Sequence, residues 1–112
     1  MSIRLPARLL VTALLRRVND AGGMAMVLAR GDADDGSILL ITADRGADCR
    51  AFERGIAERG DPVLVPVGPV GGDAAALGDY WRRRRASDPD LWVIELDIAQ
   101  AERFAAETIG FY

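Results

Sequence analysis

Residues 91–96, with the sequence Leu-Trp-Val-Ile-Glu-Leu, constrain the fold of this chain more than any other segment. Successive side chains of a β-strand point to opposite faces of the sheet, and here apolar side chains occupy both sets of positions. They are Leu91 and Val93 in one set and Trp92, Ile94 and Leu96 in the other. A strand of this kind is typical of a sheet that is covered on both sides. We therefore expect an interior strand with Trp92 largely buried.

Helices that cover such a sheet are predicted where apolar residues recur at helical spacing. The first helix is predicted over residues 7–19, between a proline and a pair of glycines. The second is predicted over residues 74–86, with Asp73 as its N-cap. Residues 97–100 resemble a capping box, which predicts a short third helix that ends at about Thr108.

The remaining strands are predicted from short apolar runs and from turn residues. Residues 24–30 and 37–43 lie on either side of a turn rich in Gly and Asp, which predicts a β-hairpin. Residues 49–53 form a shorter strand, and residues 63–67 form an edge strand because Pro66 cannot donate a ladder hydrogen bond. The whole chain is therefore predicted to be one α/β (α+β) domain. Its sheet is mixed and largely antiparallel, with four or five strands, and two or three helices pack on it.

The composition excludes several kinds of active site. All 14 basic residues are arginine, and the chain has no histidine and no lysine. Ser-His-Asp and Cys-His catalysis, histidine metal ligands and lysine Schiff bases are therefore excluded. We expect no catalytic residue, no metal site and no cofactor. We expect Cys49 to be a buried, unreactive thiol, since no histidine is present to lower its pKa.

The same composition indicates where the protein works. One cysteine allows no internal disulfide, which fits a reducing compartment. The apolar run before Arg16 and Arg17 is too short for a membrane span and is not followed by a cleavage site. We therefore expect a cytoplasmic protein with no membrane partner.

The four consecutive arginines Arg82 to Arg85 are a candidate nucleic-acid contact, because guanidinium groups bind phosphates. They also fall in the last turn of a predicted helix, where positive charge is stabilised. Acidic residues are interleaved with them, and the net charge of the chain is −3. These features therefore argue against nucleic-acid binding. The helical pattern turns Arg84 toward the sheet and the other three toward solvent.

A second candidate site surrounds Glu95, which interrupts an otherwise apolar strand face. A buried carboxylate needs a partner, and Arg84 or Arg16 could supply one. Together with Trp92, these residues are the candidate binding residues of the chain. A buried carboxylate can also act as a general acid or base, but no second carboxylate can be placed beside it.

Three motifs, taken in this order, resemble domain-of-unknown-function family 1491, a group of small bacterial proteins. They are Ala-Leu-Leu-Arg-Arg at residues 13–17, Arg-Gly-Asp at residues 30–32 with Gly36, and Asp-Pro-Asp-Leu-Trp-Val-Ile-Glu at residues 88–95. The resemblance covers roughly residues 5–97 and fits the tail from Ile98 onward less well. It implies a compact α/β domain and no particular activity.

These observations favour a non-catalytic binding or interaction module, which we expect to be a homodimer. Apolar strands and a free sheet edge at the Pro66 strand invite pairing with a second copy. The alternative is a small enzyme or binder of an anionic metabolite that uses arginine and Glu95. Nucleic-acid binding through Arg82 to Arg85 ranks third.

Overall fold

The computed structural model describes residues 5–56, 60 and 62–111. It is a single α+β domain with a five-stranded mixed sheet and three helices, so the predicted fold class is confirmed. The elements are, in chain order, α1 (Ala7–Asp20), β1 (Met24–Ala29), β2 (Ile38–Asp44), β3 (Ala47–Ile56), β4 (Pro62–Gly72), α2 (Ala74–Ser87), β5 (Trp92–Asp97) and α3 (Ala101–Phe111).

Strand β5 lies inside the sheet, as its two apolar faces predicted. The strand order is β1-β5-β2-β3-β4. β5 pairs with β2 in parallel and with β1 antiparallel, and the remaining pairs are antiparallel. Trp92 is 3% exposed. The edge position predicted for the strand with Pro66 is also confirmed, because β4 forms one edge and β1 forms the other.

The hairpin predicted between residues 24–30 and 37–43 is wrong. The two segments do form β1 and β2, but β5 lies between them. The segment that connects β1 to β2 is bonded at both ends to the residues at the start of β5. The backbone N–H of Asp32 donates to the carbonyl of Asp90, and the backbone N–H of Trp92 donates to the carbonyl of Ser37. β1 and β2 therefore each pair with β5, which is distant in sequence, and not with one another.

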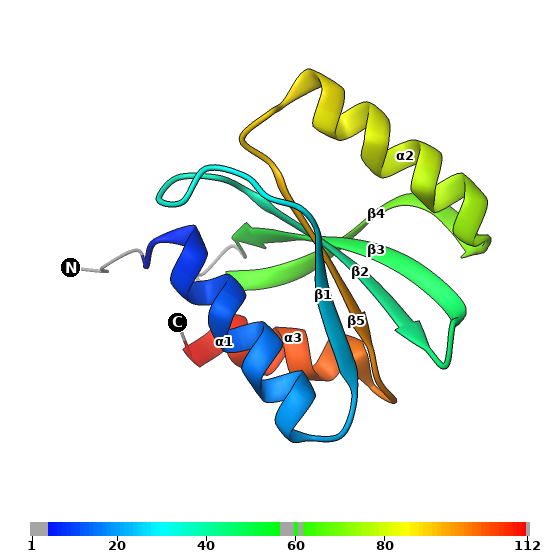
Figure 1. The fold of residues 1–112 in the computed structure, drawn as a ribbon, viewed down its shortest axis with the longest axis horizontal. Helices are drawn as coiled ribbons and strands as arrows, with labels where there is room; N and C mark the ends of the chain where they lie inside the picture. The colour runs from blue at the N-terminus through cyan, green and yellow to red at the C-terminus, as the bar shows by residue number, and fades with distance from the viewer. Residues whose placement is uncertain (1–4, 57–59, 61, 112) are drawn as a thin grey trace.

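Helices cover both faces of the sheet, and Figure 1 shows α1 and α3 together on one side and α2 alone on the other. One apolar core lies under α1 and α3 and contains Leu14, Phe52 and Trp92. The second core lies under α2 and contains Leu77 and Val93. In the part of the chain that the structure describes, none of the helices has the length and hydropathy needed to cross a membrane.

The helix starts were predicted with mixed success. The carboxylate of Asp73 accepts hydrogen bonds from the N–H groups of Ala75 and Ala76, so the predicted N-cap of α2 is confirmed. The predicted capping box at residues 97–100 is wrong, because Asp97 is the last residue of β5 and α3 begins only at Ala101. The segment 49–53 is part of a longer strand, β3.

Candidate functional site

Arg84 turns toward the sheet, as its helical position predicted, but its partner is Glu53 and not Glu95. Its guanidinium forms an ion pair with the Glu53 carboxylate of β3. The same Nη1 donates to the Tyr80 hydroxyl at 2.9 Å. Burial alone would lower the pKa of Arg84, but the hydrogen bonds to Tyr80 and Glu53 raise it above its ordinary value. Arg84 is therefore a charged link between α2 and β3.

Glu53 was missed by sequence analysis, although its signal was present. It alternates with Ala51 along β3, and Ala51 belongs to the core under α2. A period of two therefore places Glu53 on the face that α2 covers. What the sequence lacked was the placement of α2 over β3.

We predict that this ion pair stabilises the fold more than the exposed arginines do. Arg84→Gln should lower the free energy of unfolding by about 1–2 kcal/mol, because a partly buried charged hydrogen bond is lost. Arg83→Gln, on the exposed side of the same helix, should change it by less than about 0.5 kcal/mol. Urea unfolding measures both. Equal values for the two variants, or a full additional loss from Glu53→Gln in the Arg84→Gln protein, would contradict the pairing.

The other arginines of the cluster also contact the protein. Arg82 lies 3.7 Å from the Asp79 carboxylate, between Nη1 and Oδ1, and its guanidinium stacks on Trp81. Arg85 is half-buried and donates from Nη2 to the carbonyl of Arg30 at 2.7 Å. The prediction that Arg85 faces solvent is therefore wrong. Within the cluster, Arg83 is the residue for which no such contact is recorded among the described residues.

The candidate residues Glu95, Arg16 and Trp92 do not come together. Trp92 packs in the core under α1 and α3. Glu95 alternates with Val93, which packs under α2, so its side chain projects from the opposite face. Arg16 is exposed on α1, across the sheet from Glu95. Among the described residues Glu95 forms no ion pair, so its predicted pairing with Arg84 or Arg16 is wrong. Its side chain is half-buried and not fully enclosed.

Arg17, the neighbour of Arg16, was not a candidate in the sequence analysis, but its side chain contacts helix α3. Its guanidinium donates to the Thr108 hydroxyl at 3.1 Å and to the Glu107 carboxylate at 3.2 Å. These bonds join α1 to α3.

Trp92 and the turn after β1 form a tightly bonded unit. The Trp92 indole Nε1 donates to the carbonyl of Asp32 at 2.6 Å. The Asp32 carboxylate in turn accepts hydrogen bonds from the N–H groups of Asp34 and Asp35 at 3.2 and 2.8 Å. Turn geometry thus accounts for this Asp-rich segment, as the sequence indicated. We call the unit formed by residues 31–36 and 90–92 the Trp92 clamp.

The Trp92 clamp also caps helix α1, whose first residues have no acidic side chain to cap them. The first N–H groups of a helix have no partner within it. Those of Ala7 and Arg8 donate to the carbonyls of Asp34 and Ala33 at 3.0 and 2.9 Å. The clamp therefore connects β1, β5 and α1 through backbone atoms.

A hollow of about 570 Å³ lies at the opposite end of the sheet, beside the Gly22-Gly23 turn, Arg45 and Asp97. The Asp97 carboxylate accepts hydrogen bonds from the N–H groups of Arg45 and Gly46 at 2.6 and 3.0 Å. These bonds fix the β2–β3 turn. Neither Trp92 nor Glu95 lines the hollow.

Strand β1 is the feature that sequence analysis passed over. Its side chains carry no charge, and three of them are exposed apolar groups: Met24 is 70%, Met26 48% and Val27 39% exposed. Because β5 pairs with one side of β1, the backbone groups on its other side have no strand to pair with among the described residues. The run of uncharged residues from Met24 to Ala29 was visible in the sequence, but its position at an edge was not.

The comparisons with known proteins decide the family. The family model described as "Protein of unknown function (DUF1491)" matches residues 5–106. The chain belongs to the DUF1491 family. The resemblance drawn from the motifs is confirmed, and the match reaches into α3, beyond the segment that had suggested it. No curated protein matches the chain.

Solved structures share the DUF1491 fold. A crystal structure of a DUF1491 family protein from Caulobacter crescentus CB15 has a TM-score of 0.79 at 31% identity, over 90% of this chain and 94% of that chain. An NMR structure of a DUF1491 family protein from the same organism has a TM-score of 0.76 at 29% identity, over 92% and 94%. The solution structure of protein Atu0922 from A. tumefaciens has a TM-score of 0.69 at 26% identity, over 85% and 86%.

Two of the three motifs that suggested the DUF1491 family meet in the Trp92 clamp. Gly31, Asp32 and Gly36 come from one motif, and Asp90 and Trp92 come from another. A Cβ atom added to either glycine would collide with the Asp90 carbonyl. The motif residues therefore serve packing in this structure, and their presence gives no indication of an activity.

Proposed function

We propose that this DUF1491 protein is a non-catalytic interaction module that forms a homodimer through strand β1 in the bacterial cytoplasm. The observation that carries the proposal is the edge position of β1 together with the exposure of Met24, Met26 and Val27. An uncharged, apolar edge strand is a template for pairing with another strand. A second copy of the chain can satisfy it with a closed two-fold dimer.

The geometry of β1 limits how two copies can pair. The regular part of the strand runs from Met24 to Val27, because the pairing with β5 is irregular between Val27 and Ala29. A two-fold axis perpendicular to the sheet keeps every side chain on its own face. With Ala25 on that axis, Met24 of each copy lies opposite Met26 of the other. The pairing then joins apolar residues and extends the sheet across both copies.

The other edge is less suited to pairing than sequence analysis had supposed. Strand β4 contains Pro66 and Pro69, which have no N–H group to donate. Gly68 and Gly71 have positive φ angles of 75° and 104°, which bend the strand away from regular geometry. We therefore assign the dimer to β1.

Enzymatic action on an anionic metabolite has less support. Glu95 and Trp92 project from opposite faces of β5, and Arg84 is engaged with Glu53. Nucleic-acid binding also has less support, because Arg82, Arg84 and Arg85 contact the protein itself. Burial of Cys49, which is 6% exposed, agrees with a thiol kept in a reducing compartment.

Paired lysine substitutions test the assignment of the dimer to β1. Met24→Lys with Met26→Lys should give a folded monomer, because like charges then lie opposite one another across the two-fold axis. The control is Val65→Lys with Val70→Lys on β4, where the valines are 42% and 89% exposed. The control should stay dimeric in sedimentation velocity. A dimeric β1 variant, or a monomeric β4 variant, would refute this interface.

A further inference from the structure

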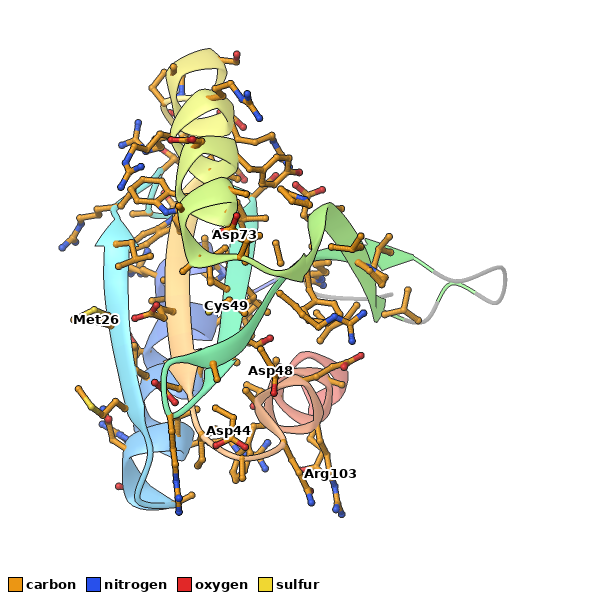
Figure 2. The ribbon with its side chains drawn as sticks, turned by 90° about the vertical axis from the view of Figure 1, so that its right-hand side faces the viewer. Met26, Asp44, Asp48, Cys49, Asp73 and Arg103 are labelled. Carbon is orange, nitrogen blue, oxygen red and sulfur yellow. The ribbon has the colours of Figure 1, made fainter. Side chains whose placement is uncertain are left out.

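Helix α2 covers only part of its face of the sheet. The core beneath it includes Leu39 and Ile41 of β2 and Val93 of β5, but not Met24 or Met26 of β1, which are 70% and 48% exposed. Figure 2 shows α2 over the upper part of this face, with Met26 and Cys49 below the helix. Strands β1, β5 and β2 continue past the helix there.

The strand registers define the uncovered part. Met26 lies beside Glu95 of β5, which lies beside Ile41 of β2. In the next row, Met24 lies beside Asp97, which lies beside Ala43. We call this surface the open face, and it consists of the exposed Met24 and Met26 and the half-buried Glu95 and Asp97, whereas Ile41 and Ala43 beside them are buried. Each row places a carboxylate between apolar side chains, and neither row contains a basic residue.

The open face is negatively charged. Burial raises the pKa of the Cys49 thiol, and the nearby charges of Glu95, Asp97 and Asp48 raise it further. Within residues 5–56, 60 and 62–111, neither Glu95 nor Asp97 belongs to an ion pair. Asp97 is held in place by the turn N–H groups of Arg45 and Gly46. The surface thus combines fixed carboxylates with the exposed thioethers of Met24 and Met26.

We propose that the open face is a docking site for a cationic amphipathic helix of a partner protein. The apolar side of such a helix would pack on Met24 and Met26, because methionine adapts to varied partner shapes. Its Lys or Arg side chains would pair with Glu95 and Asp97, so complementary charge selects the partner. The neighbouring α2 has 14 residues, and a helix of that length, about 21 Å, is long enough to cross β1 and β5, which lie about 4.8 Å apart.

This proposal rests on the interaction-module function but does not depend on the dimer. Two-fold pairing through the backbone edge of β1 leaves the face of the sheet accessible. The test therefore uses the full chain and measures binding and oligomeric state separately. Absence of peptide binding by an intact dimer would refute the docking site and leave the dimer interface standing.

The probe is a labelled 14-residue helical peptide of leucine and lysine, followed by fluorescence anisotropy. We expect saturable binding that weakens with added salt, as screened charges require. The peptide in which glutamate replaces lysine should not bind. Methyl signals of Met24 and Met26 in NMR should shift with the basic peptide.

A charge-matched pair of variants locates the binding. Glu95→Lys should weaken binding at least about tenfold, which is about 1.4 kcal/mol. The control, Glu102→Lys, changes the net charge of the protein by the same amount but lies on α3, where the Glu102 side chain is 55% exposed. It should change the affinity for the peptide less than about twofold. Glu95→Gln, which keeps the side-chain shape, should give a smaller loss in the same direction. Equal losses in both lysine variants, binding of the acidic peptide, or no binding at millimolar basic peptide would overturn the proposal.

Discussion

Trp92→Ala should lower the free energy of unfolding by about 3–5 kcal/mol, as expected for removal of a buried aromatic side chain. Trp92 is 3% exposed and lies in the core under α1 and α3. The substitution also removes the indole N–H that donates to the Asp32 carbonyl at 2.6 Å. A loss of this size is a large part of the stability of a small domain. Urea unfolding followed by circular dichroism measures it.

The second tryptophan of the chain supplies the control for this result. Trp81 is half-buried on α2 and packs at the margin of the other core. Trp81→Ala should therefore cost clearly less than Trp92→Ala. Trp92→Phe should give an intermediate loss, because the ring remains but the hydrogen bond does not. If Trp92→Ala and Trp81→Ala lower the free energy of unfolding equally, burial of β5 on both faces does not stabilise the fold as we infer.

Gly31→Ala should destabilise the protein by about 3 kcal/mol or more, because its Cβ would enter a space already filled by backbone. The added carbon would lie 2.7 Å from both the carbonyl carbon of Leu91 and the backbone nitrogen of Trp92, and closer still to the Asp90 carbonyl. Backbone atoms of β5 cannot move aside as a flexible side chain can. The clamp must open, and the hydrogen bond from Asp32 N–H to the Asp90 carbonyl is lost.

Gly78→Ala is the matched control for Gly31→Ala. Gly78 is buried in α2, but an added Cβ would meet only the guanidinium end of Arg82, at 3.0 Å. That end can move, and alanine favours a helix by about 1 kcal/mol over glycine. Thermal unfolding of Gly78→Ala should therefore show unchanged or raised stability. A Gly31→Ala protein as stable as Gly78→Ala would contradict the close packing of the clamp.

The parts of the fold that sequence analysis predicted correctly depend on local patterns. Apolar residues in both alternating sets of residues 91–96 require cover on both sides, and β5 has that cover. Asp73 stands directly before a helical pattern, and its side chain caps α2. Pro66 removes a backbone donor, and its strand lies at an edge. In each case the physical cause lies within a few residues of its effect.

The errors arose where a local pattern competed with a distant partner. Two apolar runs around a turn predict a hairpin, but β5 lies between β1 and β2 and pairs with both. Asp97 has the side chain of an N-cap, but the N–H groups of Arg45 and Gly46 use it instead.

The candidate site shows the same limit. Sequence analysis identified Arg84 and Glu95 as candidate residues, but it could not predict which residues lie next to them. The true partner of Arg84, Glu53, depends on α2 crossing β3. The apolar neighbours of Glu95, which are Met26 and Ile41, depend on β1 and β2 lying on either side of β5.

The mass of the unmodified protein in solution tests the homodimer most directly. Multi-angle light scattering over a range of micromolar concentrations should give a mass near twice the single-chain value of 12.1 kDa. The double substitution Met24→Lys with Met26→Lys should return it to the single-chain value. A wild-type mass of 12.1 kDa that does not change on concentration would contradict a dimer built on the β1 edge.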